Sequence, residues 1–260
     1  TYSDFNQAMA NTSAIAGANE EQMKKLENAA LEMGKKTTKT ATEASEALGY
    51  MALAGWDVDT SIASLEPVLR LSEATQMDLA TCSDLVTDSM SALGLTADQL
   101  TDYLNVTCQA NNKSNTTAQA LMEAMIGCGG AAKSAGMDYK QTAAALGILA
   151  NNGVKGAEAG TALNSMLVRM TTKDVAQKAF KELGVSIYDS SGQMRNMQDI
   201  LVELNGAMSG LTQEQKNNYM SAIAGTNYYT QFGYLLEGVK EGADGAASTW
   251  TSLTIQTARL

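Results

Sequence analysis

The sequence contains no histidine, one proline and three cysteines, and these scarcities exclude several classes of protein. Without histidine the chain lacks the commonest general base and a leading metal ligand, so Ser–His–Asp and Cys–His catalytic arrangements are impossible. Cys82, Cys108 and Cys128 show no CxxC spacing, which argues against a disulfide framework and a zinc site and favours a reducing compartment. We expect no catalytic, metal-binding or cofactor-binding residues.

Long apolar runs are also missing. The sequence has no stretch of about 18 consecutive apolar residues and no charged-then-apolar leader, so it predicts neither a transmembrane span nor a signal peptide within these residues. The chain begins at Thr1 rather than Met, and we expect it to be a piece of a longer protein. Its 260 residues, 45% of them apolar, are enough for one elongated domain or two small ones with a sizeable core.

Basic residues are scarce in one block of the chain. Residues 40–112 hold eleven acidic residues and one base, Arg70, whereas the rest of the chain holds seventeen of each, and the net charge is -10. Nucleic-acid affinity comes chiefly from Lys and Arg, so we predict no tight nucleic-acid binding. Helices that lie on membranes also carry Lys and Arg, so we predict no membrane contact by this segment.

Three segments of the chain share a similar sequence pattern, which is typical of a turn between two helices. The copies are AGWDVDTSIASL (54–65), LGLTADQLTDYL (93–104) and AGMDYKQTAAAL (135–146), with a weaker fourth, SGLTQEQKNNYM (209–220). In each copy a glycine ends one helix in a left-handed conformation and the next apolar residue, such as Trp56, folds back on that helix. A helix cap then follows, at Asp57, Thr96, Asp138 and Thr212, and similar caps occur at Thr40 with Glu43 and at Thr116 with Gln119.

These signals predict an all-α fold, a multi-helix array of antiparallel helical hairpins with short Gly/Asp/Thr turns. Strand signals are limited to VSIYDSSGQMR (185–195), which predicts at most one small β-hairpin. Pro67 either kinks the helix that starts near Val58 or opens a new one. We expect a helical lead-in at 1–39, a helical repeat core at 40–172, and a second helical part with the hairpin at 173–260, which is either separate from the core or continuous with it.

The segment NGVKGAEAGTAL (152–163) places Gly153, Gly156 and Gly160 close together. A phosphate-binding loop would need GxxxxGK[ST] or GxGxxG directly after a strand, and neither spacing is present. From Ala159 to Met170 the apolar residues follow one helical stripe. We therefore interpret this cluster, with Gly55, Trp56, Gly94 and Gly136, as turn and helix-packing residues.

Acidic pairs and aromatic residues are weaker candidates for function. Asp84 with Asp88, and Asp57 with Asp59, could serve as metal ligands or acid–base partners, but helix surface and helix-start charge explain them better. The aromatic residues that cluster near the end of the chain indicate either an interface between copies or the core of the last helical pair; they are Tyr228, Tyr229, Phe232 and Tyr234. Contact between copies could use apolar stripes or bases such as Lys173, Lys178 and Lys181, and we expect apolar packing.

Several segments together resemble the core region of phage tail tape measure proteins of the TP901 type. They are MALAGWDVDTSIASLEPVLRLSEAT (51–75), DLVTDSMSALGL (84–95), LGILANNGVKGAEAGTALNSMLVRM (146–170), LGVSIYDSSGQMRNMQDILVEL (183–204) and LTQEQKNNYMSAIAG (211–225). The resemblance implies a fragment of a structural protein that lies in the tail-tube lumen, helps set tail length during assembly and leaves ahead of the DNA. It implies no enzymatic activity and no cofactor. It also implies the virion tail as location, after assembly in the bacterial host cytoplasm, and other copies, tail tube and tail-assembly proteins as partners.

Two other functions stay open from the residues alone. A tail-associated helical cell-wall hydrolase would need a catalytic glutamate whose pKa is raised by burial, and Glu123 and Glu158 are the candidates near apolar stripes. A membrane-active helical module is the second alternative. Its helices would be expected to carry basic residues, which are few in the acidic block.

Overall fold

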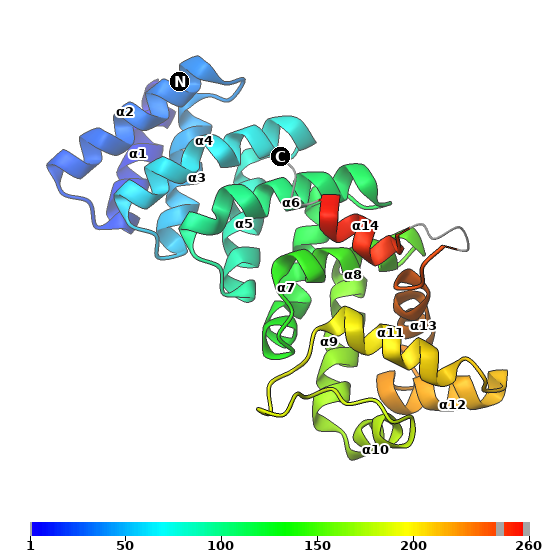
Figure 1. Cartoon of the computed structure of the whole chain (residues 1–260). Coiled ribbons are helices and arrows are strands. Elements are labelled where there is room, and N and C mark those ends of the chain that lie inside the picture. The colour runs from blue at the N-terminus through cyan, green and yellow to red at the C-terminus, as the bar shows by residue number, and fades with distance from the viewer. Residues whose placement is uncertain (1, 243–246, 257–260) are drawn as a thin grey trace. The chain divides into compact units, whose positions relative to one another are not determined.

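The computed structural model describes residues 2–242 and 247–256, which form 14 α-helices joined by turns (Figure 1). No strand occurs among these residues. The predicted hairpin near residues 185–195 is reduced to a single antiparallel bridge between Tyr188 and Met194. The all-α prediction is therefore confirmed for the described part of the chain.

The elements divide between two compact units. Unit 1 comprises the residues up to Ser91 together with Leu95–Leu104, and unit 2 comprises Ala92–Gly94 and the residues from Asn105 onward. The division that the sequence predicted, at residues 39 and 172, stays a prediction. In chain order the elements are α1 (Tyr2–Ala16), α2 (Glu20–Lys36), α3 (Ala41–Leu53), α4 (Val58–Thr75), α5 (Leu79–Leu93), the 3-10 turn η1 (Ala97–Gln99), α6 (Leu100–Lys113), α7 (Ala118–Ser134), α8 (Tyr139–Asn151), α9 (Gly156–Thr172), α10 (Asp174–Glu182), α11 (Met197–Met208), α12 (Gln213–Ala224), α13 (Tyr229–Gly238) and α14 (Thr249–Gln256).

Helix α3 lies at the centre of unit 1, because α1, α2 and α4 all pack against it. Its side chains Ala47, Leu48 and Met51 have no exposed surface, and burying a side chain such as Leu48 contributes about 1.5–3 kcal/mol. A buried hydrogen bond also joins α1 to α3, since the Thr12 hydroxyl donates to the carbonyl of Ser45 over 2.8 Å. Unit 1 is therefore built around one small, apolar helix.

Helix α8 has the central place in unit 2. Helices α7, α9, α13 and α14 pack against it, and every residue from Thr142 to Ala150 is buried. A helix that is apolar all round is stable only when it is covered on all sides. The sequence AALGILA, which shows no polar face, accordingly occupies the middle of the unit.

Helices α7 and α9 approach each other through small residues. A Cβ atom added to Gly160 of α9 would lie 2.4 Å from the carbonyl oxygen of Ala124 and 3.0 Å from its Cα, both on α7. On α7 itself, a Cβ atom at Gly127 would lie 3.5 Å from the backbone of Gly160. The apolar stripe predicted from Ala159 to Met170 is buried beside this contact. Glycine at position 160 therefore sets how close the two helices come.

Four predicted turn glycines share one hydrogen-bonding pattern. Gly55, Gly94, Gly136 and Gly153 have positive φ angles between 68° and 87°. In each turn, the N–H of the residue after the glycine donates to the carbonyl five residues earlier, which closes the helix end. These bonds are Trp56 to Met51 (3.1 Å), Leu95 to Met90 (2.8 Å), Met137 to Ala132 (2.9 Å) and Val154 to Leu149 (3.0 Å).

The weaker fourth copy ends its helix differently. The N–H of Leu211 donates to the carbonyl of Met208, three residues earlier, over 3.1 Å. Gly210 is not among the glycines with a positive φ angle. The sequence pattern of this copy therefore predicts the cap of the next helix, α12, correctly, but it does not predict how α11 ends.

The predicted helix caps lie where expected, with one correction. The Asp57 carboxylate accepts the N–H of Thr60 over 2.8 Å, and the Asp138 carboxylate accepts that of Gln141 over 2.7 Å. The cap predicted at Thr116 is wrong by one residue. Thr117 accepts the N–H of Ala120 over 3.1 Å instead, and the N–H of Ala118, the first residue of α7, donates to the side chain of Asn111 over 3.0 Å.

Pro67 lies inside α4 and does not open a new helix. The turn predicted at residues 189–192 is present, because the Asp189 carboxylate accepts the N–H groups of Ser191 and Gln193 over 2.8 and 3.0 Å. The Ser191 hydroxyl also donates to this carboxylate, over 2.7 Å, and this bond, followed by the one from the N–H of Gln193, lowers the pKa of Asp189. Backbone hydrogen bonds from Asp189 to Gln193 and from Arg195 to Ile187, both 2.9 Å long, also join the two arms of this loop between α10 and α11.

The close approach of α7 and α9 generates a stability prediction. Gly160→Leu should lower the free energy of unfolding by about 1–3 kcal/mol or more, because the new side chain meets backbone that cannot move aside. Gly130→Leu is the matched control, because Gly130 lies on α7, the helix that Gly160 contacts, but has no atom within 4 Å of its added Cβ. It should change stability by less than about 1 kcal/mol. Urea unfolding of both variants measures the difference. Equal, small losses would contradict the assigned contact.

The helix caps generate a pH prediction. The N–H of Thr60 holds the pKa of Asp57 below its ordinary value of 3.8. The folded pKa is thus below the unfolded one, so the stabilisation is complete above about pH 4 and is lost as the pH falls through the folded pKa. Asp57→Asn keeps a capping side chain but cannot titrate. Its melting temperature should fall less between pH 5 and pH 2 than that of the unmodified chain, by circular dichroism; an identical fall would refute the assignment.

Candidate functional site

Residues 2–242 and 247–256 contain no group of three or more Cys, Asp or Glu side chains placed to hold a metal ion. Burial, and to a lesser extent the neighbouring Asp88, raises the pKa of Asp84. Burial also raises the pKa of the Cys128 thiol to about 12, which keeps the thiol protonated at neutral pH. No described helix has the length and hydrophobicity that a membrane span requires.

The glycine cluster at residues 153–160 surrounds the start of α9. Gly153 has open space around it, whereas Gly156 adopts a left-handed conformation, with φ +57°, at the first position of the helix. A Cβ atom at Gly156 would lie 3.3 Å from a carboxylate oxygen of Glu123. An acidic group therefore already stands at the positive end of this helix, where a bound phosphate would have to lie.

Gly156 and Gly160 differ in their surroundings, although the sequence places them on one helical face. Gly160 meets the backbone of α7, whereas Gly156 meets only the end of a flexible side chain. Lys155, beside the cluster, donates from Nζ to the side chain of Asn115 over 2.9 Å. The packing and turn roles of Gly55, Trp56, Gly94, Gly136 and the cluster agree with these positions, but any functional role beyond the fold stays a prediction.

The aromatic cluster near the end of the chain does not act as one patch. Phe232 is only 1% exposed and belongs to the core of α13. Tyr229 and Tyr234 line a groove between α11, α12 and α13, which we call the α11–α13 groove. Tyr228 lines a separate pocket beside α9. Only the three tyrosines are therefore positioned to contact a partner.

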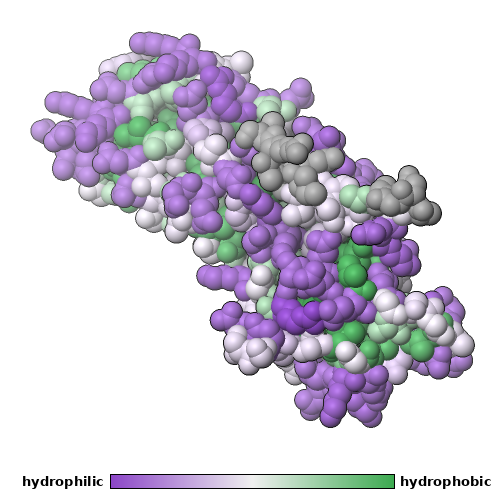
Figure 2. All heavy atoms as spheres, in the orientation of Figure 1, coloured by the Kyte–Doolittle hydropathy of each residue, from purple (hydrophilic) through white to green (hydrophobic). Residues whose placement is uncertain are grey.

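The α11–α13 groove combines an apolar floor with charged residues. Met208, Met220 and Leu236 line it together with the two tyrosines. Lys216, Lys240 and Glu237 also line it, and Lys240 pairs with Glu237. In Figure 2, hydrophobic residues show between hydrophilic ones over the part of the view where Figure 1 places α11 and α12. The groove therefore presents both apolar and charged side chains.

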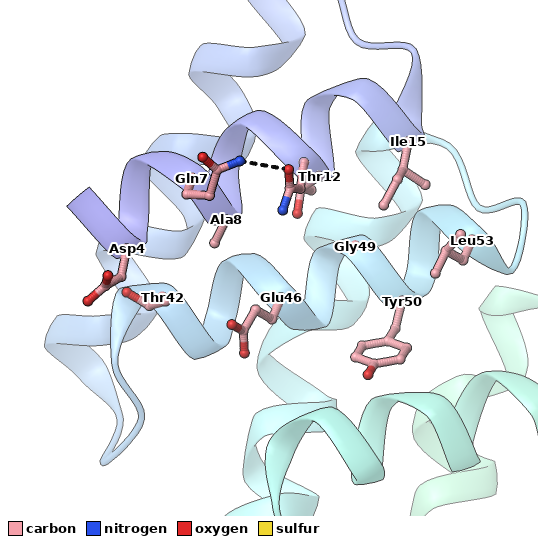
Figure 3. Close-up of a pocket in the computed structure, with 11 residues that line it drawn as sticks. Asp4, Gln7, Ala8, Thr12, Ile15, Thr42, Glu46, Gly49, Tyr50 and Leu53 are labelled. Carbon is pink, nitrogen blue, oxygen red and sulfur yellow. Dashed lines mark hydrogen bonds between the residues drawn. The ribbon is translucent and has the colours of Figure 1, made fainter. Parts of the chain in front are cut away.

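A second groove lies between α1 and α3 in unit 1, and we call it the α1–α3 groove. Figure 3 shows the two helices running in the same direction, with Asp4 and Thr42 at one end and Ile15 and Leu53 at the other. Ile15 is 45% exposed and Leu53 is 67% exposed. No residue pattern in the sequence pointed to this groove, because its two walls come from segments about 40 residues apart that meet only in the folded unit.

Comparison with known proteins identifies the chain's relatives. Residues 27–225 match the model of the family described as "Phage-related minor tail protein". The chain is 33% identical over 242 residues to the "Tape measure protein" of Pneumococcus phage Dp-1, an alignment that covers 93% of this chain. It is 28% identical over 244 residues to the "Probable tape measure protein" of Escherichia phage P2, covering 92% of this chain.

The relatives are much longer than the chain. The aligned part spans 21% of the Dp-1 protein and 30% of the P2 protein. No solved structure matches the chain.

Proposed function

The chain belongs to the family of phage-related minor tail proteins, and from this premise we propose that it is one segment of a tail tape measure protein. In this role the protein lies in the lumen of the tail tube, helps set tail length during assembly and is released when the DNA is ejected. The observation that carries the proposal is the alignment of more than nine tenths of the chain with two proteins named as tape measure proteins. The segment works in the virion tail and is present in the bacterial host cytoplasm while tails assemble.

The fold supports a structural role. The hydrogen bonds and buried side chains of its described residues end, cap and pack the helices. Under this proposal the segment performs no reaction. Glu123, one candidate for a cell-wall hydrolase, accepts a hydrogen bond from Gln119 over 2.9 Å and faces the start of α9. Glu158, the other candidate, is exposed.

The tail role generates a genetic prediction. We expect peptides of this chain in purified tails by mass spectrometry. An in-frame deletion of the codons for residues 40–172 should give shorter tails, by at most about 1.5 Å per residue removed, or no assembled tails. Electron microscopy of the particles measures this, with synonymous recoding of the same codons as the control. Tails of normal number and length after the deletion would rule the proposal out.

We further propose that copies of the segment contact one another through the α11–α13 groove. Tyrosine side chains supply much apolar area at low entropic cost and are enriched among residues that dominate binding energy. Tyr229 and Tyr234 are both half-buried and stand in the same groove. The remaining partners, tail tube and tail-assembly proteins, follow from the proposed function rather than from a particular surface.

This contact generates a prediction about self-association. Replacing Tyr229 and Tyr234 together by serine should weaken association by about tenfold or more. Tyr2→Ser, at a residue that is 80% exposed on α1, is the control and should have no effect. Sedimentation velocity from 0.01 to 0.5 M NaCl measures both, and apolar packing should persist at high salt. Oligomers that dissociate as salt rises would show that ion pairing, not this groove, holds the copies together.

A further inference from the structure

A small polar pocket lies in unit 2 beside the C-terminal half of α9. Its walls come from α9 and from the segment Ala224–Tyr228, which ends α12 and leads into α13. The volume of the pocket is about 390 Å³. We call it the α9–α12 pocket, and the tail function proposed above does not use it.

The charge of the pocket is opposite to that of the whole chain. Arg169 and Lys173 line it, and no aspartate or glutamate is among its lining residues, although the chain has a net charge of -10. Neither base forms an ion pair with a carboxylate in the part of the chain that the structure describes, whereas other bases such as Arg70 and Arg195 do. Both bases therefore line the pocket without an ion-paired carboxylate.

Arg169 is held in position from two sides. Its Nε–H donates to the carbonyl oxygen of Ala222 over 3.1 Å. Its Cδ lies 3.4 Å from the position that a Cβ atom would take at Gly225, whose φ is +91°. These contacts hold the side chain while using one of the five N–H groups of the guanidinium. A pre-positioned arginine loses little entropy when it binds an anion.

Neutral donors complete the pocket. Asn164, Ser165, Thr226 and Asn227 line it beside the two bases, and amide and hydroxyl groups of this kind donate readily to oxyanions. Helix α13 begins next to this segment without a side-chain cap at Tyr228, so the positive end of its dipole adds to the potential there. The helix end only reinforces the attraction that Arg169 and Lys173 create.

A purely structural role explains part of this arrangement. Bases at the end of α9 stabilise the negative end of that helix, and the bond from Arg169 to Ala222 joins α9 to α12. Neither contribution accounts for a concave site that gathers two cations and four neutral donors and contains no acid. We propose that the α9–α12 pocket binds an oxyanion of the phosphate class. A tetrahedral anion can accept from donors on several walls at once, whereas a planar carboxylate offers two oxygens in one plane.

The test is a titration of the whole 260-residue chain with inorganic phosphate, at constant ionic strength kept with NaCl. Amide NMR should show saturable shifts confined to residues near Gly225–Tyr228 and to the Nε–H of Arg169, with a dissociation constant on the order of 1 mM. Arg169→Gln and Lys173→Gln should each weaken binding by about tenfold. The control is Lys178→Gln, a base on α10 that pairs with Glu182 over 3.8 Å, and it should bind as the unmodified chain does.

Titrations with two other anions test whether the pocket prefers free phosphate to a carboxylate or to a nucleic-acid backbone. Acetate at equal concentration should bind at least about tenfold more weakly than phosphate. A short single-stranded oligonucleotide should bind no better per phosphate, because the net charge of -10 on the chain disfavours a polyanion. The absence of saturable shifts, equal binding by acetate, or unchanged binding in the Lys173 variant would each overturn the proposal. The exposed Lys173 keeps the test decisive even if Arg169→Gln unfolds the chain.

Discussion

One hydrogen bond recurs at four of the turns between the helices of this protein. The residue after a left-handed glycine returns its N–H to the carbonyl five residues earlier, at Gly55, Gly94, Gly136 and Gly153 alike. The bond satisfies a carbonyl that a helix end would otherwise leave open, and it folds an apolar side chain back onto the finished helix. A capping side chain then starts the next helix within a few residues, at Asp57 or Asp138 for example. The chain reverses direction between helices because the glycine that ends one helix and the side chain that caps the next are adjacent in the sequence. The cores of both units depend on that reversal.

Much of the fold could be predicted from the sequence because its signals are local. A glycine, an apolar residue and a cap within four positions specify a turn without reference to the rest of the chain, and the stripe from Ala159 to Met170 specifies a buried face. The errors arise where the sequence does not decide between similar residues that lie close together. Two adjacent threonines could each cap α7, and in the structure Thr117 rather than Thr116 accepts the N–H of Ala120. The left-handed conformation of Gly156 places a glycine of the cluster outside the helix-packing contact.

The candidate sites were harder to predict than the fold, because their residues meet only after the helices have packed. Spacing in the sequence groups Tyr228, Tyr229, Phe232 and Tyr234, but a helix sends successive side chains in different directions, so one enters the core and the others line two separate sites. Arg169 and Ala222 are 53 residues apart and meet only when α12 packs on α9. Residue type gave no reason to single out Arg169, since what distinguishes it is the absence of an acid from its surroundings.

The central position of α8 has a consequence for synthesis of the chain on the ribosome. Unit 1 holds all its residues once Leu104 has emerged, so its core can close early. Helix α8 emerges much later and must wait for α14, whose Leu253 comes within 3.1 Å of the Cβ position at Gly147. During that interval an apolar helix stands uncovered on one side, and transiently exposed apolar surface of this kind is what chaperones bind. The apolar surface of α8 thus stays partly uncovered while about a hundred further residues are synthesised. This number is comparable with the number of residues in the whole first unit.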